Sequence, residues 1–495
     1  MTKKIGGKEI YNEYFITVED KRHKCKVCSR LYTQDIKKGY SNLVTHIQNE
    51  HSDRLDVMKV NDEKNVNPFF HKESNTIFNW LDCIIGCELP LSFCEGDSVK
   101  DYSKLAPVSV EDLMKYIPLI TDKVEKKIAD SLPDQFGIII DGWNEDSTYH
   151  IALFANFDGH EVGPYPLLAI APPIDETDFT IESHHFIIEC VLERYGKSSK
   201  NLIYLVAENT VVNTGLADLL GIPMIGCASH RFHLACKKYL EGSERILQKI
   251  QSLMMTLQQR KHARKLQAKT DLVPIIWNVL NWKTLPYEMV SSFFRIEEFI
   301  DATDEDLATK IPTASEMIDL KRLMEDLEQF QATAMSIQED ERNLHEVRLI
   351  FDEMLKHYPI MDNYISSNGA LVHSPDFEGA IIQVIDNYVD SLNARQEQLL
   401  TPFRKVNNVR TSEVQTDVPY ALQALKKKRR FNHNAFIDLS FIPPTCNIMR
   451  KSFKETAYCM FKPTSDPDWL NFLMFLKINR QLWDYSLVSN LVING

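Results

Sequence analysis

The sequence has no apolar run of the roughly 20 residues that a membrane-spanning helix needs. Its first ten residues, MTKKIGGKEI, are charged and no apolar segment follows them, which is unlike a secretory signal. Ten cysteines in 495 residues are too few for a disulfide scaffold. We therefore expect an intracellular protein that does not contact a membrane, and whose cysteines are free thiols or metal ligands.

The length and the hydrophobic content, 44% of 495 residues, predict two to four folded units with real cores. The whole chain has 56 basic and 69 acidic side chains, a net charge of −13, but this charge is unevenly distributed. Residues 1–54 instead contain eleven Lys/Arg and seven Asp/Glu, a net charge of +4. Contact with nucleic acid is therefore expected at the N-terminal part, or at local patches such as KKKRR at 426–430.

A metal-ligand pattern occupies residues 25–51. Cys25 and Cys28 are spaced C-x2-C, and after seventeen residues His46 and His51 are spaced H-x4-H. A tetrahedral zinc ion takes two thiolates from a tight turn and two imidazoles from a helix, and this spacing supplies both. The sequence therefore predicts a Zn²⁺ site. His23 lies outside the pattern, and we expect it to be exposed.

The segment from about residue 10 to residue 54 resembles a BED-type zinc finger. An aromatic pair, Tyr14 and Phe15, precedes the first cysteine, and polar side chains lead into the histidine helix. That family binds DNA, so the resemblance implies double-stranded DNA as a partner, with the start of the helix in the major groove. The implied DNA-contacting residues are Lys37, Lys38, Ser41 and Asn42. The alternatives are that the lysines are only solvated, or that the finger binds protein.

Apolar runs in the middle of the chain predict strands. Three of them read as an antiparallel meander, and the first ends in Asp141. A further strand that begins near residue 201 ends in Glu208. If the strands of Asp141 and Glu208 are neighbours, their carboxylates meet at one edge of the sheet. The three runs of the meander are 136–141, 149–157 and 165–173.

The segment IGCASHRFHLACKKYL at 225–240 is similar to the cysteine-x-x-histidine segment of hAT-superfamily transposases, with Cys227 and His230 in the motif positions. Combined with the finger and the two acid-bearing strands, it makes the chain resemble that superfamily over residues 10–54 and about 100–485. Segments at 280–290 and 469–484 look like the family's tryptophan segment and its C-terminal dimerisation helix. Packing explains Cys227 and His230 better than catalysis or metal binding does.

The resemblance implies a multidomain α+β protein: a small zinc finger and an RNase H-like mixed α/β core that a large helical insertion interrupts. It also implies a nuclear location and a homodimer or higher homo-oligomer. The expected divisions are a finger at 10–54, a linker at 55–75, a helical segment at 76–130, the first part of the core at 131–234, the insertion and connector at 235–433, and the last part of the core with the dimerisation helix at 434–495.

The catalytic acids of the resembled family are Asp, Asp and Glu, which hold two metal ions. Asp141 matches the first, and Glu208 stands at the second, one methylene longer. The stretch PTCNIMRKSF at 444–453 places Arg450 at the position of the third acid, and the nearest acid is Glu455. A guanidinium in place of a carboxylate inverts the local charge. The set of catalytic acids is therefore degenerate.

These observations favour a zinc-dependent DNA-binding protein that is derived from a hAT-type transposase and has lost nuclease activity. One alternative is an active transposase that uses Mg²⁺, with Glu455 or another residue as the third acid. The other alternative is a dimeric protein-interaction module without a DNA role.

Overall fold

The computed structural model describes residues 10–494 apart from 12–13, 20, 29, 36–38, 52–70, 146–147, 160–161, 164, 172–179, 278–284, 340–341, 406–434 and 449–466. The chain divides into two compact units, one made of Met1–Glu125 with Glu455–Gly495 and the other of Lys126–Lys454. Within the described residues, no helix has the length and apolarity required to cross a membrane.

The first unit begins with a small antiparallel sheet of strand order β1-β2-β3, followed by helix α2. Its core contains few side chains, among them Tyr14 and Phe15 from the start of the sheet and Leu43 and Ile47 from one face of the helix. So small a core is typical of a domain that needs a metal to fold. The elements are β1 (Phe15–Glu19), β2 (Arg22–Cys25), β3 (Leu31–Thr33) and α2 (Ser41–Glu50).

The other helices of this unit bring the C-terminal end of the chain onto α4, which packs against both α22 and α23. Arg480 donates from Nε to Asp82 Oδ1 at 3.0 Å, and Lys477 pairs with Glu88. The side chains of Leu473 and Trp483 are buried. The helices are α4 (Lys72–Cys87), α5 (Asp97–Tyr102), α22 (Pro467–Ile478) and α23 (Tyr485–Asn494), and α6 (Val110–Ser131) begins in this unit and ends in the second.

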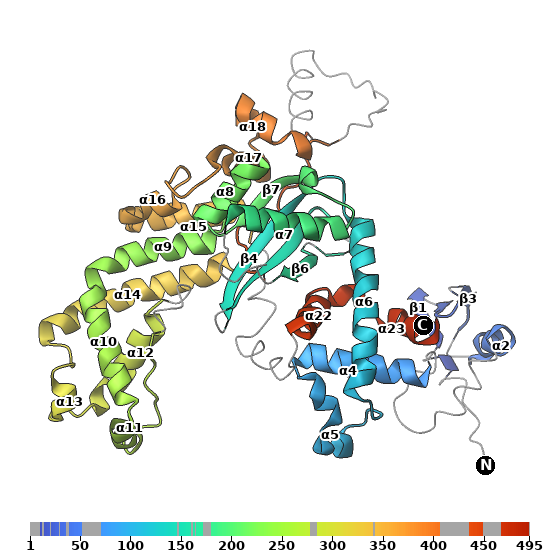
Figure 1. The fold of residues 1–495 in the computed structure, drawn as a ribbon, viewed down its shortest axis with the longest axis horizontal. Helices are drawn as coiled ribbons and strands as arrows, with labels where there is room; N and C mark the ends of the chain where they lie inside the picture. Colours follow the sequence, from blue (N-terminus) through green and yellow to red (C-terminus); the bar gives the residue numbers. More distant parts are fainter. Residues whose placement is uncertain are drawn as a thin grey trace. The chain divides into compact units, whose positions relative to one another are not determined.

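The second unit contains a five-stranded mixed sheet of strand order β6-β5-β4-β7-β8 (Figure 1). Strands β4, β5 and β6 are antiparallel neighbours, as the predicted meander requires, whereas β7 and β8 run parallel to β4. The strands are β4 (Phe136–Glu145), β5 (Thr148–Asn156), β6 (Leu167–Ala171), β7 (Leu202–Ala207) and β8 (Met224–Gly226). With the small N-terminal sheet and the helices described below, this sheet confirms the predicted fold class.

Strand β4 is longer than the apolar run that predicted it. It continues to Glu145, which pairs with Thr148 of β5, because the two strands form a hairpin. The prediction that Asp141 ends its strand is therefore wrong: Asp141 lies within β4 and pairs with Ala152. On the other edge of β4, the pairing with β7 extends only to Ile139, so Asp141 lies just beyond that ladder.

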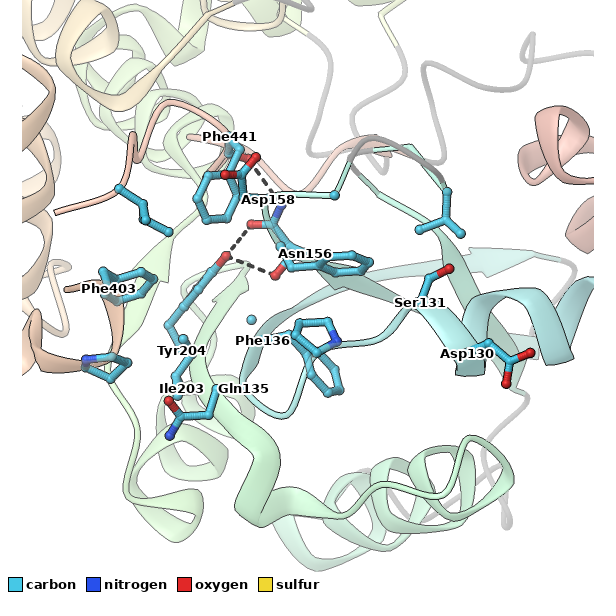
Figure 2. A pocket seen from close by; sticks show the side chains of 17 residues that line it. Asp130, Ser131, Gln135, Phe136, Asn156, Asp158, Ile203, Tyr204, Phe403 and Phe441 are labelled. Atoms are coloured by element: carbon cyan, nitrogen blue, oxygen red, sulfur yellow. Dashed lines mark hydrogen bonds between the residues drawn. The ribbon is translucent and has the colours of Figure 1, made fainter. Parts of the chain in front are cut away.

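A glycine lets β4 and β7 approach closely near their starts. A Cβ atom added at Gly137 would lie 2.0 Å from the ring of Tyr204, so no other residue fits without a shift. The Tyr204 hydroxyl is buried and donates to Asn156 Oδ1 on β5 at 2.5 Å (Figure 2). This arrangement fixes the three central strands side by side.

A long series of helices separates the sheet from the segment that returns to it. Helix α9 leaves the sheet after β8, and its Phe232 packs against Phe330 of α14 and Phe351 of α15 in the core of the helical insertion. Helix α17 then contacts β8 again. The helices of this unit are α7 (Ile181–Arg194), α8 (Val211–Leu220), α9 (Ala228–Leu240), α10 (Glu244–Leu257), α11 (Arg260–Gln267), α12 (Tyr287–Ile296), α13 (Glu305–Ala308), α14 (Ala314–Ile337), α15 (Leu344–His357), α16 (Asp362–Ile365), α17 (Pro375–Ile385) and α18 (Ala394–Leu399).

Candidate functional site

The two cysteines of the N-terminal pattern lie at a tight turn between β2 and β3. Cys25 is the last residue of β2, and its N–H donates to the carbonyl of Arg30 at 2.9 Å, which closes the turn. Cys28 lies inside this turn. Both thiols therefore come from one short backbone segment, as a zinc site requires.

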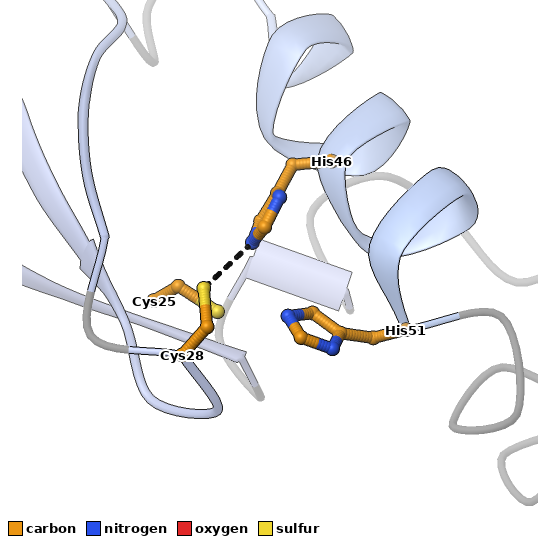
Figure 3. A group of neighbouring side chains, drawn as sticks. All are labelled: Cys25, Cys28, His46 and His51. Atoms are coloured by element: carbon orange, nitrogen blue, oxygen red, sulfur yellow. Dashed lines mark hydrogen bonds between the residues drawn. The ribbon is translucent and has the colours of Figure 1, made fainter.

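The two histidines come from the end of α2. His46 lies on the buried face of this helix, and His51 caps its C-terminus with an N–H bond to the carbonyl of Ile47. One ligand atom from each of Cys25, Cys28, His46 and His51 lies within 4.8 Å of all the others. Figure 3 shows the four side chains converging on one point, where Cys28 Sγ lies 3.4 Å from His46 Nε2. The four predicted ligands thus come together.

The surroundings of the histidines fit a zinc ion. His46 Nδ1 lies 2.9 Å from the hydroxyl of Tyr32, so this nitrogen can carry the proton and leave Nε2 for the metal. His51 Nε2 is buried and has no hydrogen-bond partner. Burial raises the pKa of the Cys25 thiol and, with nearby His51, lowers the pKa of His46. The cluster can therefore hold a metal, and two thiols with two imidazoles suit zinc.

His23 does not lie in solvent as predicted; it is 1% exposed. Its Nε2–H donates to the carbonyl of Gln34 at 2.9 Å, and its Nδ1 accepts from the hydroxyl of Tyr11 at 3.0 Å. The ring also makes an edge contact with the Tyr11 ring. Both nitrogens are satisfied, so the expectation that His23 is exposed is wrong, although its exclusion from the metal-ligand pattern stands.

Two of the four predicted DNA-contacting residues lie at the start of α2. Ser41 and Asn42 form its first turn, and both are exposed. Lys37 and Lys38 lie outside the described residues. Because Ser41 and Asn42 are exposed, the first turn of α2 is accessible to a ligand.

The second cluster lies beyond the point where the pairing of β4 with β7 ends. Ile139 of β4 pairs with Val206 of β7, so Asp141 and Glu208 each follow the last paired residue by two positions. The two strands are therefore neighbours, which is the condition under which the two carboxylates were expected to meet, and one ligand atom from each carboxylate lies within 4.8 Å of the other. Asp141 is 2% exposed.

The third member of this cluster is a thiol that the sequence did not indicate. Cys446 Sγ lies within 4.8 Å of the Asp141 and Glu208 ligand atoms, and its backbone N–H donates to Cys227 Sγ at 3.5 Å. The hydrogen bond between the two thiols, burial and the neighbouring negative charges raise the pKa of Cys446. The only sequence signal was the position of Cys446 in the same stretch as Arg450. Arg450 itself lies outside the described residues, as does Glu455.

The Cys227 and His230 motif supports the backbone around Glu208. Cys227 is fully buried, and its N–H donates to the carbonyl of Ala207 at 2.8 Å. The N–H of Asn209 donates to His230 Nδ1 at 3.1 Å. These contacts hold the loop that carries Glu208 against the start of α9.

A pocket of about 490 Å³ lies at the opposite end of the sheet (Figure 2). The first residues of β4 and β7 line it, whereas Asp141 and Glu208 lie toward the other ends of those strands. Tyr204 and Asn156 form part of its wall, and Asn156 Nδ2 donates to the carbonyl of Phe441 at 3.1 Å. Burial raises the pKa of Tyr204. The pocket is therefore separate from the carboxylates of Asp141 and Glu208.

No protein-family model matches the sequence, and no curated protein matches it. One solved structure to which the chain is distantly similar is the Drosophila P element transposase strand transfer complex, at 10% sequence identity and a TM-score of 0.28. The match covers 86% of this chain and 99% of that chain.

Proposed function

We propose that this chain is a zinc-dependent protein that binds double-stranded DNA through its N-terminal finger. The observation that carries the proposal is the convergence of Cys25, Cys28, His46 and His51, whose two thiols and two imidazoles are the ligand types of a structural zinc site. The BED-type resemblance of the same segment and the net charge of +4 over residues 1–54 support a DNA partner over a protein partner.

The zinc ion would act by fixing α2 against the small sheet. Ser41 and Asn42 would then enter the major groove, because they are exposed on the first turn of this helix. Lys37 and Lys38 would neutralise phosphates, a contact that adds affinity but reads no sequence. Zinc removal is expected to abolish binding because the helix loses its support.

The test is binding of the full chain to duplex DNA over a range of salt concentrations. Replacing Lys37 and Lys38 with alanine should reduce the salt slope by about one unit for each lost phosphate contact. The matched control is Lys123→Ala with Lys126→Ala, which removes two exposed charges from α6. Equal losses in both double variants, or tight binding after Cys25→Ser, would refute the assignment to the finger.

We propose further that the core does not cut DNA. Two metal ions carry four positive charges and need several oxygen ligands. Asp141 and Glu208 supply two carboxylates, and among the described residues the third group within 4.8 Å of both is the Cys446 thiol, a soft ligand that suits Mg²⁺ poorly. The sequence adds Arg450 where the resembled family has its third acid.

The proposal that the core does not cut DNA is tested by a strand-cleavage assay with Mg²⁺ or Mn²⁺. The substrate is DNA that carries the ends of the element from which the chain would derive. We expect no cleavage by the wild-type chain. Cleavage that disappears in Asp141→Asn would establish the alternative, an active two-metal transposase. Activity gained only in Arg450→Glu combined with Glu208→Asp would support the loss of function in the natural sequence.

A nuclear location and self-association belong to the same proposal. Leu473, Met474 and Leu476 of α22 are buried, and α22 packs on α4, so this packing already accounts for much of the helix's apolar character. A homodimer therefore needs its own evidence. Sedimentation at micromolar concentration should show a dimer, and a monomer would remove this part of the proposal.

A further inference from the structure

A buried histidine lies between two aspartates in the helical insertion, away from both clusters described above. His262 of α11 is 2% exposed. Its Nδ1 lies 3.7 Å from Asp304 Oδ2, and its Nε2 lies 3.4 Å from Asp306 Oδ2. One ligand atom from each of the three residues lies within 4.8 Å of the other two.

The imidazole is not satisfied by its surroundings. His262 Nδ1 is buried and has no hydrogen-bond partner. A buried polar atom without a hydrogen-bond partner destabilises the folded state, so its persistence calls for an explanation, such as an ion. The nearby Asp304 side chain is itself only 7% exposed.

The three side chains are held by well-anchored elements. Leu266 fixes α11 in the core of the insertion, and Leu307 fixes α13 in the same core. Asp304 caps α13 and accepts the N–H of Asp306 through Oδ1 at 3.2 Å, so its Oδ2 faces the histidine. Ligands on such elements need little rearrangement to bind an ion.

We propose that His262, Asp304 and Asp306 form a second metal site, which takes a divalent transition cation such as Zn²⁺. An imidazole binds one ion through one nitrogen, and here that nitrogen is Nδ1, which has no hydrogen-bond partner. Metal–nitrogen and metal–oxygen bonds of about 2.0–2.2 Å can together span roughly 4 Å, which includes the 3.7 Å between Nδ1 and Asp304 Oδ2. Asp306 would join as the third ligand through its exposed carboxylate. An imidazole nitrogen favours zinc and its neighbours over Mg²⁺ and Ca²⁺, which prefer oxygen. Three protein ligands leave a coordination position for water.

Two lysines occupy the carboxylates when no ion is bound. Lys261 Nζ lies 2.7 Å from Asp306 Oδ2, and Lys265 Nζ lies 2.7 Å from Asp304 Oδ2. Both lysine side chains are more than half exposed, so they can turn into solvent. One dication would then replace two ammonium groups, which leaves the total charge of the site unchanged.

The test counts zinc in the full chain by equilibrium dialysis. His262→Gln should lose one zinc, Cys25→Ser should lose a different one from the finger, and the double variant should lose both. In Asp304→Asn, the affinity of this second site for zinc should fall by more than the roughly 10–100-fold that loss of a supporting partner causes. Unchanged zinc content and affinity in His262→Gln would overturn the proposal, whether or not the finger binds zinc.

Asp301→Asn is the matched control, because Asp301 accepts from Thr303 and is not part of the cluster. An equal weakening in this control would reduce the effect to general electrostatics and overturn the proposal.

Variants of the exposed lysines keep the test valid if a buried substitution disturbs folding. Exposed ion pairs each change an equilibrium constant about two- to fivefold, so Lys261→Gln with Lys265→Gln should tighten zinc binding by about 4–25-fold. Lys269→Gln is the control, since Lys269 donates to the carbonyl of Phe299 instead. Tighter zinc binding in the double variant but not in Lys269→Gln supports the site. Equally tighter zinc binding in the double variant and in Lys269→Gln, or unchanged zinc binding in both, overturns it.

Discussion

Removal of the Glu378 carboxylate should destabilise the second unit strongly. Glu378 of α17 accepts from Arg231 Nη2 of α9 at 3.0 Å through Oε2, and its Oε1 accepts the N–H of Gly226 at 3.2 Å. Arg231 is 3% exposed and Glu378 is 7% exposed. The pair therefore joins the last strand of the sheet, the first helix of the insertion and the helix that returns to the sheet.

The expected magnitude follows from what Glu378→Leu leaves behind. The guanidinium of Arg231 cannot be deprotonated, and its Nε and Nη1 already have no hydrogen-bond partner. Breaking a buried pair in this way costs about 3–5 kcal/mol. Arg231→Met should cost less, because a lone carboxylate can take up a proton and still accept from Gly226. The double variant should be more stable than Glu378→Leu, because no buried charge remains.

Native-state hydrogen exchange of α9 and α17 measures these differences without assuming that the whole chain unfolds in one step. A loss of about 3–5 kcal/mol corresponds to exchange that is faster by about 10²- to 10⁴-fold. Glu241→Gln is the control, since Lys238 and Glu241 form an exposed pair on the same stretch, with a 2.8 Å separation. It should change exchange by less than about fivefold. A small effect of Glu378→Leu, or strictly additive effects of the two single substitutions, would refute this reasoning.

Three further outcomes are expected. Tyr32→Phe should weaken zinc binding by the full chain about 10–100-fold in competition with a chelator, because the hydroxyl that orients His46 is lost; unchanged affinity would argue against this orientation. Gly137→Ala should lower the melting temperature, since its Cβ would lie 2.0 Å from the Tyr204 ring, and Tyr204→Leu should relieve part of the loss; a neutral Gly137→Ala would contradict the packing described. Chelation of zinc should abolish exchange protection in α2 and leave β4 and β7 protected; protection of α2 that survives the chelator would show that the finger folds without metal.

Short-range patterns were sufficient to predict the parts of the protein whose contacts are local. The spacing of Cys25, Cys28, His46 and His51 indicated a shared site, and their ligand atoms do converge. Apolar runs indicated the antiparallel meander, because consecutive strands joined by short turns pair with one another. The position of Asp141 within β4 was predicted wrongly, since the hairpin to β5 extends past the apolar run.

His23 shows that the local sequence does not reveal whether a polar side chain is buried. Nothing in its neighbourhood along the chain distinguishes it from a solvated histidine, and its partners are Tyr11 and the carbonyl of Gln34, each eleven or twelve positions away. The satisfaction of both ring nitrogens depends on how β2 lies against the rest of the small sheet. Burial of a polar side chain is thus a property of the folded unit.

The sequence by itself determined the metal-ligand spacing, the strands of the meander and the helical character of the insertion, because each depends on residues that are close along the chain. Only the tertiary structure decided which distant groups meet. Cys446 lies beside Asp141 and also beside Cys227, which is 219 positions earlier in the chain. His262 meets Asp304 only when α11 and α13 share a core. Such contacts arise from the packing of whole elements, which no local periodicity encodes.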